Sequence, residues 1–123
     1  MNKRNVVHIE IPAADSAKAA KFYEALFGWK TTRDEKMDYV LWEPTEGPGG
    51  GFSPLGEDTQ PGDILIHISS DDIDADLKKV VNLGGSIIRQ STEIPGFGWF
   101  GVFKDPTGNM ISLFKSKNPQ PNN

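Results

Sequence analysis

The chain has 123 residues, of which 37% are hydrophobic and 24% are charged, and this is the length of one ordinary domain. It contains no cysteine, so disulfides, thiolate metal sites and cysteine nucleophiles are excluded. Its 13 basic and 17 acidic side chains give a formal net charge of −4, a balance that argues against a protein that binds duplex nucleic acid.

The N-terminal segment predicts no targeting signal. Residues 1–5 include two cations, but no long apolar segment follows them, as it would in a signal peptide. No run of residues approaches the roughly 18 apolar positions of a membrane span. We therefore expect a cytoplasmic protein without a membrane or nucleic-acid partner.

The first strand is predicted over Val6–Pro12. Alternation along an extended strand puts Ile9 and Ile11 on one face. His8 and Glu10 therefore share the other face, and they become candidates for polar contacts.

A helix follows this strand. Asp15 is placed to cap its first turn, and Gly28 ends it at a position where a left-handed residue is favoured. Three short strand candidates come next: Lys30–Thr32, Tyr39–Trp42 and Gly51–Ser53.

The second half of the chain repeats this plan. Ile64–Ile68 reads as a strand, Asp72 or Asp71 as a helix cap and Gly84-Gly85 as the helix end. The strand candidates that follow are Ser86–Arg89, Trp99–Phe103 and Met110–Phe114. A strand and a capped helix of similar length that occur twice indicate an internal duplication.

The predicted fold class is α+β, with two βαβββ modules and mixed sheets in a single domain over residues 1–123. Module one covers residues 5–55, a connector covers 56–62 and module two covers 63–116. Residues 117–123 are expected to be a disordered tail. Since helices shield one face of each sheet, the other faces must meet or enclose a ligand.

Several motifs resemble the vicinal oxygen chelate superfamily, which includes glyoxalase I, bleomycin-resistance proteins and extradiol dioxygenases. The motifs are His8-Ile-Glu-Ile-Pro-Ala-Ala-Asp15, Lys21-Phe22-Tyr23 and Phe27-Gly28-Trp29 in the first half, and Asp71-Asp72-Ile73-Asp74-Ala75, Leu83-Gly84-Gly85 and Lys104-Asp105-Pro106-Thr107-Gly108-Asn109 in the second. The resemblance covers about residues 6–115. It implies a partial barrel around a cleft, a small-molecule ligand and a homodimer.

In metal-dependent members of the superfamily, ligands come from the first and last strands of each module. The matching positions here are His8, Leu65, Ser112 and the Gly49–Phe52 segment. Only His8 is a good ligand, and a divalent ion needs at least three. The chain therefore resembles a glyoxalase-related subgroup without the full ligand set, and we expect no bound metal.

A substitute metal set remains open, since two histidines and a carboxylate are a known ligand combination. Module symmetry makes His67 the counterpart of Glu10, so His8, Glu10 and His67 are expected to converge. Such a group suits a general-base arrangement, whereas a metal site here would be shifted by two residues from the geometry of the superfamily. The alternative is that these are ordinary polar residues on half-solvated strands.

Aromatic side chains are the other candidates for a ligand site, because small-molecule pockets are mostly apolar. Trp99 lies on one strand candidate, and Phe52, Tyr39 and Trp42 lie on neighbouring candidates. Core packing is the competing explanation for these aromatic residues. The predicted ligand-binding residues are His8, Glu10, His67, Phe52, Trp99 and Ser112.

Three functions follow from these patterns. The leading hypothesis is a small-molecule-binding protein or a metal-independent enzyme of the glyoxalase or bleomycin-resistance type. The first alternative is a metal-dependent lyase or isomerase, related to glyoxalases and dioxygenases, with its ion on His8. The second alternative is an antibiotic-sequestering protein without catalysis, for which the acidic charge would suit a cationic ligand.

Overall fold

The computed structural model describes residues 4–118, which form two compact units. One unit contains residues 7–65, and the other contains residues 66–118 together with the N-terminal residues 4–6. Each unit contains one helix and four strands, so the predicted α+β class and the two βαβββ modules with mixed sheets are confirmed. The partial barrel around a cleft stays a prediction. Among residues 4–118, no helix has the length and hydrophobicity of a membrane span.

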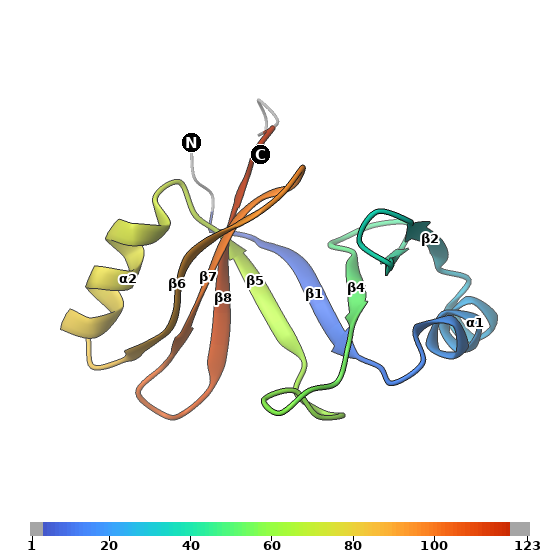
Figure 1. Cartoon of the computed structure of the whole chain (residues 1–123), viewed down its shortest axis with the longest axis horizontal. Helices are drawn as coiled ribbons and strands as arrows, with labels where there is room; N and C mark the ends of the chain where they lie inside the picture. The colour runs from blue at the N-terminus through green and yellow to red at the C-terminus, as the bar shows by residue number, and fades with distance from the viewer. Residues whose placement is uncertain (1–3, 119–123) are drawn as a thin grey trace. The chain divides into compact units, whose positions relative to one another are not determined.

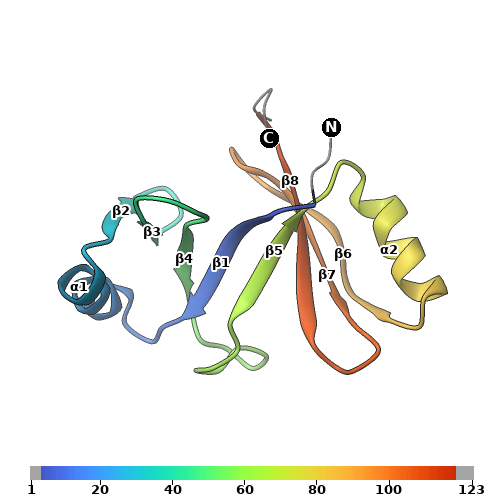
Figure 2. The same cartoon turned by 180° about the vertical axis from the view of Figure 1, so that it is seen from behind.

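Module one contains the elements β1 (Val6–Pro12), α1 (Ser16–Phe27), β2 (Lys30–Asp34), β3 (Tyr39–Glu43) and β4 (Gly50–Ser53). Its strands are ordered β2-β3-β4-β1. The β1 and β4 strands run parallel, whereas β2–β3 and β3–β4 are antiparallel pairs. The helix α1 packs against β2, β3 and β4 of this mixed sheet, and Figure 2 labels these elements.

The helix α1 begins and ends as its sequence predicts. The Asp15 carboxylate accepts a hydrogen bond of 3.1 Å from the Lys18 N–H, and this satisfies a backbone donor of the first turn. Gly28 has φ +74° and donates its N–H to the Glu24 carbonyl at 2.9 Å. Gly28 thus stops the helix in the left-handed conformation that glycine adopts without strain.

The core of module one lies between α1 and the sheet. Ala20, Trp42 and Phe52 are its buried residues. Ile9 and Ile11 pack against this cluster, which confirms that they face the helix. His8 and Glu10 therefore point to the opposite face of β1.

Module two contains β5 (Leu65–Ser69), α2 (Ile73–Asn82), β6 (Ser86–Ile94), β7 (Gly98–Lys104) and β8 (Met110–Ser116). Its strands are ordered β5-β8-β7-β6. The β5 and β8 strands are parallel, and the other pairs are antiparallel. Both views show α2 beside the long β6, β7 and β8 strands (Figures 1 and 2).

The core of module two has the same plan. Ile73 and Leu77 of α2 form a buried cluster with Leu113 of β8. The partly buried residues that pack against it are Ile68, Ile87, Trp99 and Phe103. Since Ile68 and Leu113 face the helix, the residues just before them, His67 and Ser112, point to the other face.

The strand β6 differs from its prediction, because it continues from Arg89 to Ile94. Its second half pairs with the start of β7, after register shifts on either side of Arg89. The turn at Gly96, with φ +85°, closes this hairpin, so the glycine-containing segment between β6 and β7 is a tight turn. The sequence did not predict this extension, because its polar residues and the irregular register give no regular alternation of apolar and polar positions.

Candidate functional site

A hydrogen-bonded cluster lies on the polar face of module one. The Tyr39 hydroxyl lies 2.5 Å from both carboxylate oxygens of Glu10, to which it donates. It also lies 2.9 Å from Nε2 of His8. The direct distance from His8 Nε2 to Glu10 Oε2 is longer, at 3.5 Å. The hydroxyl therefore forms the link between the imidazole and the carboxylate.

The strands of module one bring these three side chains together. His8 and Glu10 are two positions apart on β1, so they share a face. On β3, Val40 packs into the helix-side core, so its neighbour Tyr39 points to the opposite face with His8 and Glu10. The three side chains come from the strands β1 and β3, and the register of both strands with β4 brings them together.

The cluster is partly enclosed. The side chains of His8 and Glu10 are 26% and 16% exposed, so both are only partly buried. Burial, the charge of Glu10 and the hydrogen bond to Glu10 all raise the pKa of Tyr39 far above that of a free tyrosine. The phenol therefore keeps its proton at neutral pH and acts as a hydrogen-bond donor.

The predicted residues of module two lie on the corresponding face of their own sheet. His67 and Ser112 are register partners on the parallel strands β5 and β8, and both are buried. The His67 ring meets Phe114 edge-on, with a centroid distance of 6.4 Å. The expected convergence of His67 with His8 and Glu10 stays a prediction.

Phe52 and Trp99 lie on different faces from the other predicted residues. Phe52 is the register partner of Ile11 and belongs to the α1-side core. Trp99 packs on the α2-side cluster, the face opposite His67 and Ser112. Strand register explains why Phe52 and Trp99 face the helices, because paired residues on neighbouring strands point to the same face. No local sequence pattern specifies this register, so the sequence did not predict it. Contact of Phe52 or Trp99 with a ligand stays a prediction.

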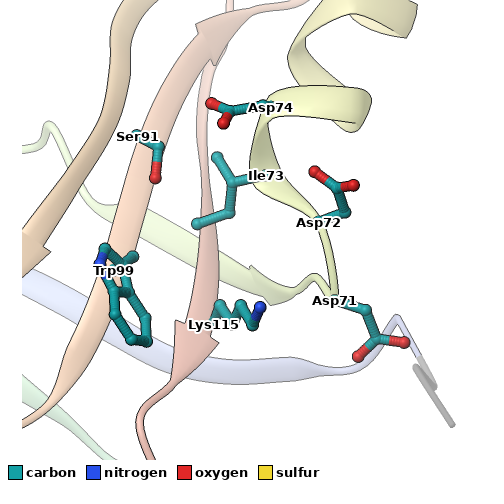
Figure 3. Close-up of a pocket in the computed structure, with 7 residues that line it drawn as sticks. All are labelled: Asp71, Asp72, Ile73, Asp74, Ser91, Trp99 and Lys115. Carbon is teal, nitrogen blue, oxygen red and sulfur yellow. The ribbon is translucent and has the colours of Figure 1, made fainter.

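Trp99 also lines a pocket of about 310 Å³ at the start of α2 (Figure 3). The indole lies beside Lys115, whose Nζ is 5.9 Å from the ring centroid. The pocket is lined by Asp71, Asp72, Ile73, Asp74, Ser91, Trp99 and Lys115. These residues lie on the α2 side of the sheet, so this pocket is separate from the face that carries His67.

The donor atoms of module one do not fit a divalent metal ion. His8 and Glu10 supply two good donors, and the third polar group is a phenol that keeps its proton. A tightly bound divalent ion needs at least three good protein donors. Within residues 4–118, no three histidine, aspartate or glutamate side chains are grouped as a metal site would require.

The sequence patterns did not assign Tyr39 to the polar cluster, since its aromatic ring suggested only an apolar wall. Two signals pointed to it. The alternation in Tyr39–Trp42 places Tyr39 opposite the core-facing tryptophan, and the glycines at 50 and 51 indicate a strand that a bulky neighbour approaches closely.

The comparisons with known proteins agree with this fold. Residues 7–114 match the family model described as a glyoxalase-like domain. Two relatives are 27% identical: the putative glyoxylase CFP32 of Mycobacterium tuberculosis, over 88% of this chain and 44% of that protein, and the anthracycline biosynthesis protein DnrV of Streptomyces peucetius, over 86% and 45%. This chain spans about half the length of these two relatives.

Solved structures show the same architecture. The hypothetical protein BH1468 from Bacillus halodurans superposes with a TM-score of 0.75 at 15% identity, over 96% of this chain and 98% of that chain. This likeness concerns the fold, while the family model covers both modules from β1 to β8. The chain belongs to the glyoxalase-like domain family of the vicinal oxygen chelate superfamily.

Proposed function

We propose that this glyoxalase-like protein binds a small organic molecule at the His8–Tyr39–Glu10 cluster and transfers a proton to or from it without a metal ion. The observation that carries this proposal is the chain of hydrogen bonds from His8 through Tyr39 to Glu10. An imidazole and a carboxylate that are both partly exposed are suited to general acid–base catalysis.

The ligand positions of the superfamily support the metal-independent form of this proposal. Leu65 and Ser112 stand where metal-dependent members carry ligands, and neither side chain is a good metal donor. In module one, the last strand offers glycine at positions 50 and 51. His8 is the one remaining ligand position with a good metal donor, and its imidazole is hydrogen-bonded to the protonated phenol of Tyr39.

Exchange of carbon-bound hydrogen for solvent deuterium tests this proposal across a whole class of compounds. The protein is incubated in heavy water with a panel of small aldehydes, ketones and their thiol adducts, and deuterium at the carbon next to the carbonyl is measured by mass spectrometry. We expect metal-stripped protein to label at least one compound. Both Glu10→Gln and His8→Gln should lower that rate by about 10²-fold or more.

Asp58→Asn is the matched control, since Asp58 is an exposed residue outside the cluster. It should exchange at the wild-type rate. Labelling that occurs only after a divalent metal is added would contradict the proposal and favour the metal-dependent lyase or isomerase. Equal rates in wild type, Glu10→Gln and His8→Gln would also contradict it.

The name of one relative favours a second candidate function. DnrV is named for anthracycline biosynthesis, so a polycyclic aromatic antibiotic is a reasonable ligand for a non-catalytic member of the family. Titration of the protein with a fluorescent anthracycline tests this function. Saturable binding at one molecule per chain, with the ligand recovered unchanged and no deuterium exchange on the carbonyl panel, would favour sequestration over catalysis.

A further inference from the structure

The Tyr39 hydroxyl has one proton and two partners, and this fixes the direction of its hydrogen bonds. Glu10 offers only acceptor atoms when it is ionised, and both of its oxygens are 2.5 Å from the hydroxyl. The phenol proton therefore points to Glu10. The phenol oxygen is left as the acceptor for the contact with His8, so His8 must donate from Nε2 at 2.9 Å.

This ordering sets the protonation pattern of the cluster. A neutral imidazole has one protonated nitrogen, and the contact with Tyr39 assigns that proton to Nε2. The chain of donors then runs from His8 Nε2–H to the Tyr39 hydroxyl and from that hydroxyl to the Glu10 carboxylate. A positive charge that develops on His8 is thereby coupled to the negative charge of Glu10 through one hydroxyl.

Gly51 is the second part of this arrangement. It is the register partner of Glu10 on the parallel strand β4, so it lies directly beside the carboxylate-bearing position. A Cβ atom at Gly51 would lie 1.8 Å from the Tyr39 hydroxyl oxygen and 2.1 Å from its Cζ. Any side chain at position 51 would therefore expel the hydroxyl from its place between His8 and Glu10.

The position of the hydroxyl is not explained by core packing. The core of module one is built on the other face of β3, from Trp42 and Val40. Phenylalanine at position 39 would cover the same strand surface, but it would leave His8 and Glu10 without their shared partner. The hydroxyl contacts both His8 and Glu10, and the bare backbone at Gly51 leaves room for it.

We propose that Tyr39 is a positioning residue that joins His8 and Glu10 into one proton-sharing unit, and that Gly51 is required to admit its hydroxyl. This inference rests on the proposed function, because it assigns the residue that lets the acid–base pair work without a metal ion. Tyr39 acts here through His8 and Glu10 and need not touch the ligand.

Nitrogen-15 NMR of the two histidines tests the inference in the full chain without any ligand. His8 and His67 are the only histidines, so each signal is assigned by substituting the other residue. In the wild type, we expect neutral His8 to carry its proton on Nε2. We also expect a slowly exchanging hydroxyl proton from Tyr39, downfield of the amide signals.

Two variants at separate positions should produce the same change. Tyr39→Phe removes the hydroxyl, and Gly51→Ala displaces it while Tyr39 remains in the chain. In both variants, the downfield proton should be lost and the His8 ring signals should move in the same direction. Tyr23→Phe and Gly56→Ala are the matched controls, since a Cβ at Gly56 has nothing within 4 Å, and both should keep the wild-type signals.

Two results would overturn the inference: neutral wild-type His8 with its proton on Nδ1, or unchanged His8 signals in folded Tyr39→Phe. The amide spectrum of each variant shows whether it is folded. If Gly51→Ala does not fold, Tyr39→Phe alone decides the outcome. If the NMR test fails and deuterium exchange succeeds, the role of Tyr39 is rejected and the proposed function stands. If deuterium exchange fails and the NMR test succeeds, the proposed function is rejected and the role of Tyr39 in positioning His8 and Glu10 stands.

Discussion

The surroundings of Tyr39 in the polar cluster raise the pKa of its phenol. Burial comes first among the causes that raise its pKa, followed by the charge of Glu10 and the hydrogen bond to Glu10. All three disfavour a phenolate in the folded protein. In the unfolded chain, the same phenol titrates near the ordinary value of about 10.

We therefore predict that the Tyr39 contribution to stability is fully present below pH ~10 and is lost as the pH rises above it. Above that pH the unfolded state binds fewer protons than the folded state, so the free energy of unfolding falls by up to about 1.4 kcal/mol per pH unit. Urea unfolding of wild type and Tyr39→Phe at pH 9 and pH 11 measures this difference. Equal losses in the two proteins would contradict the predicted ionisation.

The site could be predicted in part from individual residues. His8 and Glu10 were identified by alternation on β1, because the intervening Ile9 and Ile11 indicated which face of the strand meets the helix. Tyr39 was not assigned to the polar cluster, because an aromatic residue on a strand satisfies core packing equally well. Its role depends on the β3–β4 and β1–β4 registers, which no local pattern specifies.

At the scale of elements, the two helices have matching caps. Asp15 accepts from the Lys18 N–H at 3.1 Å, and Asp72 accepts from the Ala75 N–H at 3.0 Å. We predict that Asp15→Ala and Asp72→Ala each lower the free energy of unfolding by about 1 kcal/mol. Asp15→Ser and Asp72→Ser, which keep a capping oxygen, should stay within a few tenths of a kcal/mol. Denaturant unfolding would contradict the capping role if alanine and serine variants were equally stable.

The helix α2 also contacts the N-terminal segment, through an ion pair between Arg4 and Asp76. The Arg4 guanidinium pairs with both oxygens of Asp76, and the Ser70 hydroxyl donates to Asp76 at 2.6 Å. Asn5 accepts a hydrogen bond of 2.9 Å from the Ser69 N–H on β5. These contacts lie within one unit and tie residues 4–6 to module two.

The hydrogen bond from Arg4 is the largest cause of the lowered pKa of Asp76, followed by burial, which opposes it, and by the hydrogen bond from Ser70. A lowered pKa gives a stabilisation that is present above the unfolded value of about 3.9 and is lost as the pH falls through the folded value. We predict that Asp76→Asn loses less stability than wild type when the pH falls from 5 to 3. Thermal unfolding across this range measures the effect, and parallel curves for the two proteins would exclude it.

The ten elements were predictable from the sequence because several signals agreed for each one. Each helix has an N-cap aspartate and a following glycine. The strand before α1 alternates in polarity, and the strand before α2 is an apolar run interrupted by His67. The extension of β6 was missed because its polar residues depend on pairing with β7 and carry no apolar alternation of their own. Local chemistry therefore specified the order of elements, while long-range pairing decided their lengths and registers.

At the scale of the whole molecule, the chain combines a glyoxalase-like fold with a depleted set of metal donors. The family model covers residues 7–114. At the positions that match the metal ligands of metal-dependent members, however, the last strands of the two modules carry glycine, phenylalanine and serine. In place of a third donor, module one has a tyrosine hydroxyl between its histidine and its glutamate. Fold membership alone therefore does not identify the chemistry of this chain.

Metal stoichiometry distinguishes a metal-independent His8–Tyr39–Glu10 site from a metal-dependent one. The purified protein is incubated with zinc, nickel, manganese or iron(II), dialysed, and analysed by elemental mass spectrometry beside His8→Ala. We predict far less than one retained ion per chain for each metal, with no difference between wild type and His8→Ala. One tightly held ion per chain in the wild type, lost in His8→Ala, would contradict the metal-independent His8–Tyr39–Glu10 site.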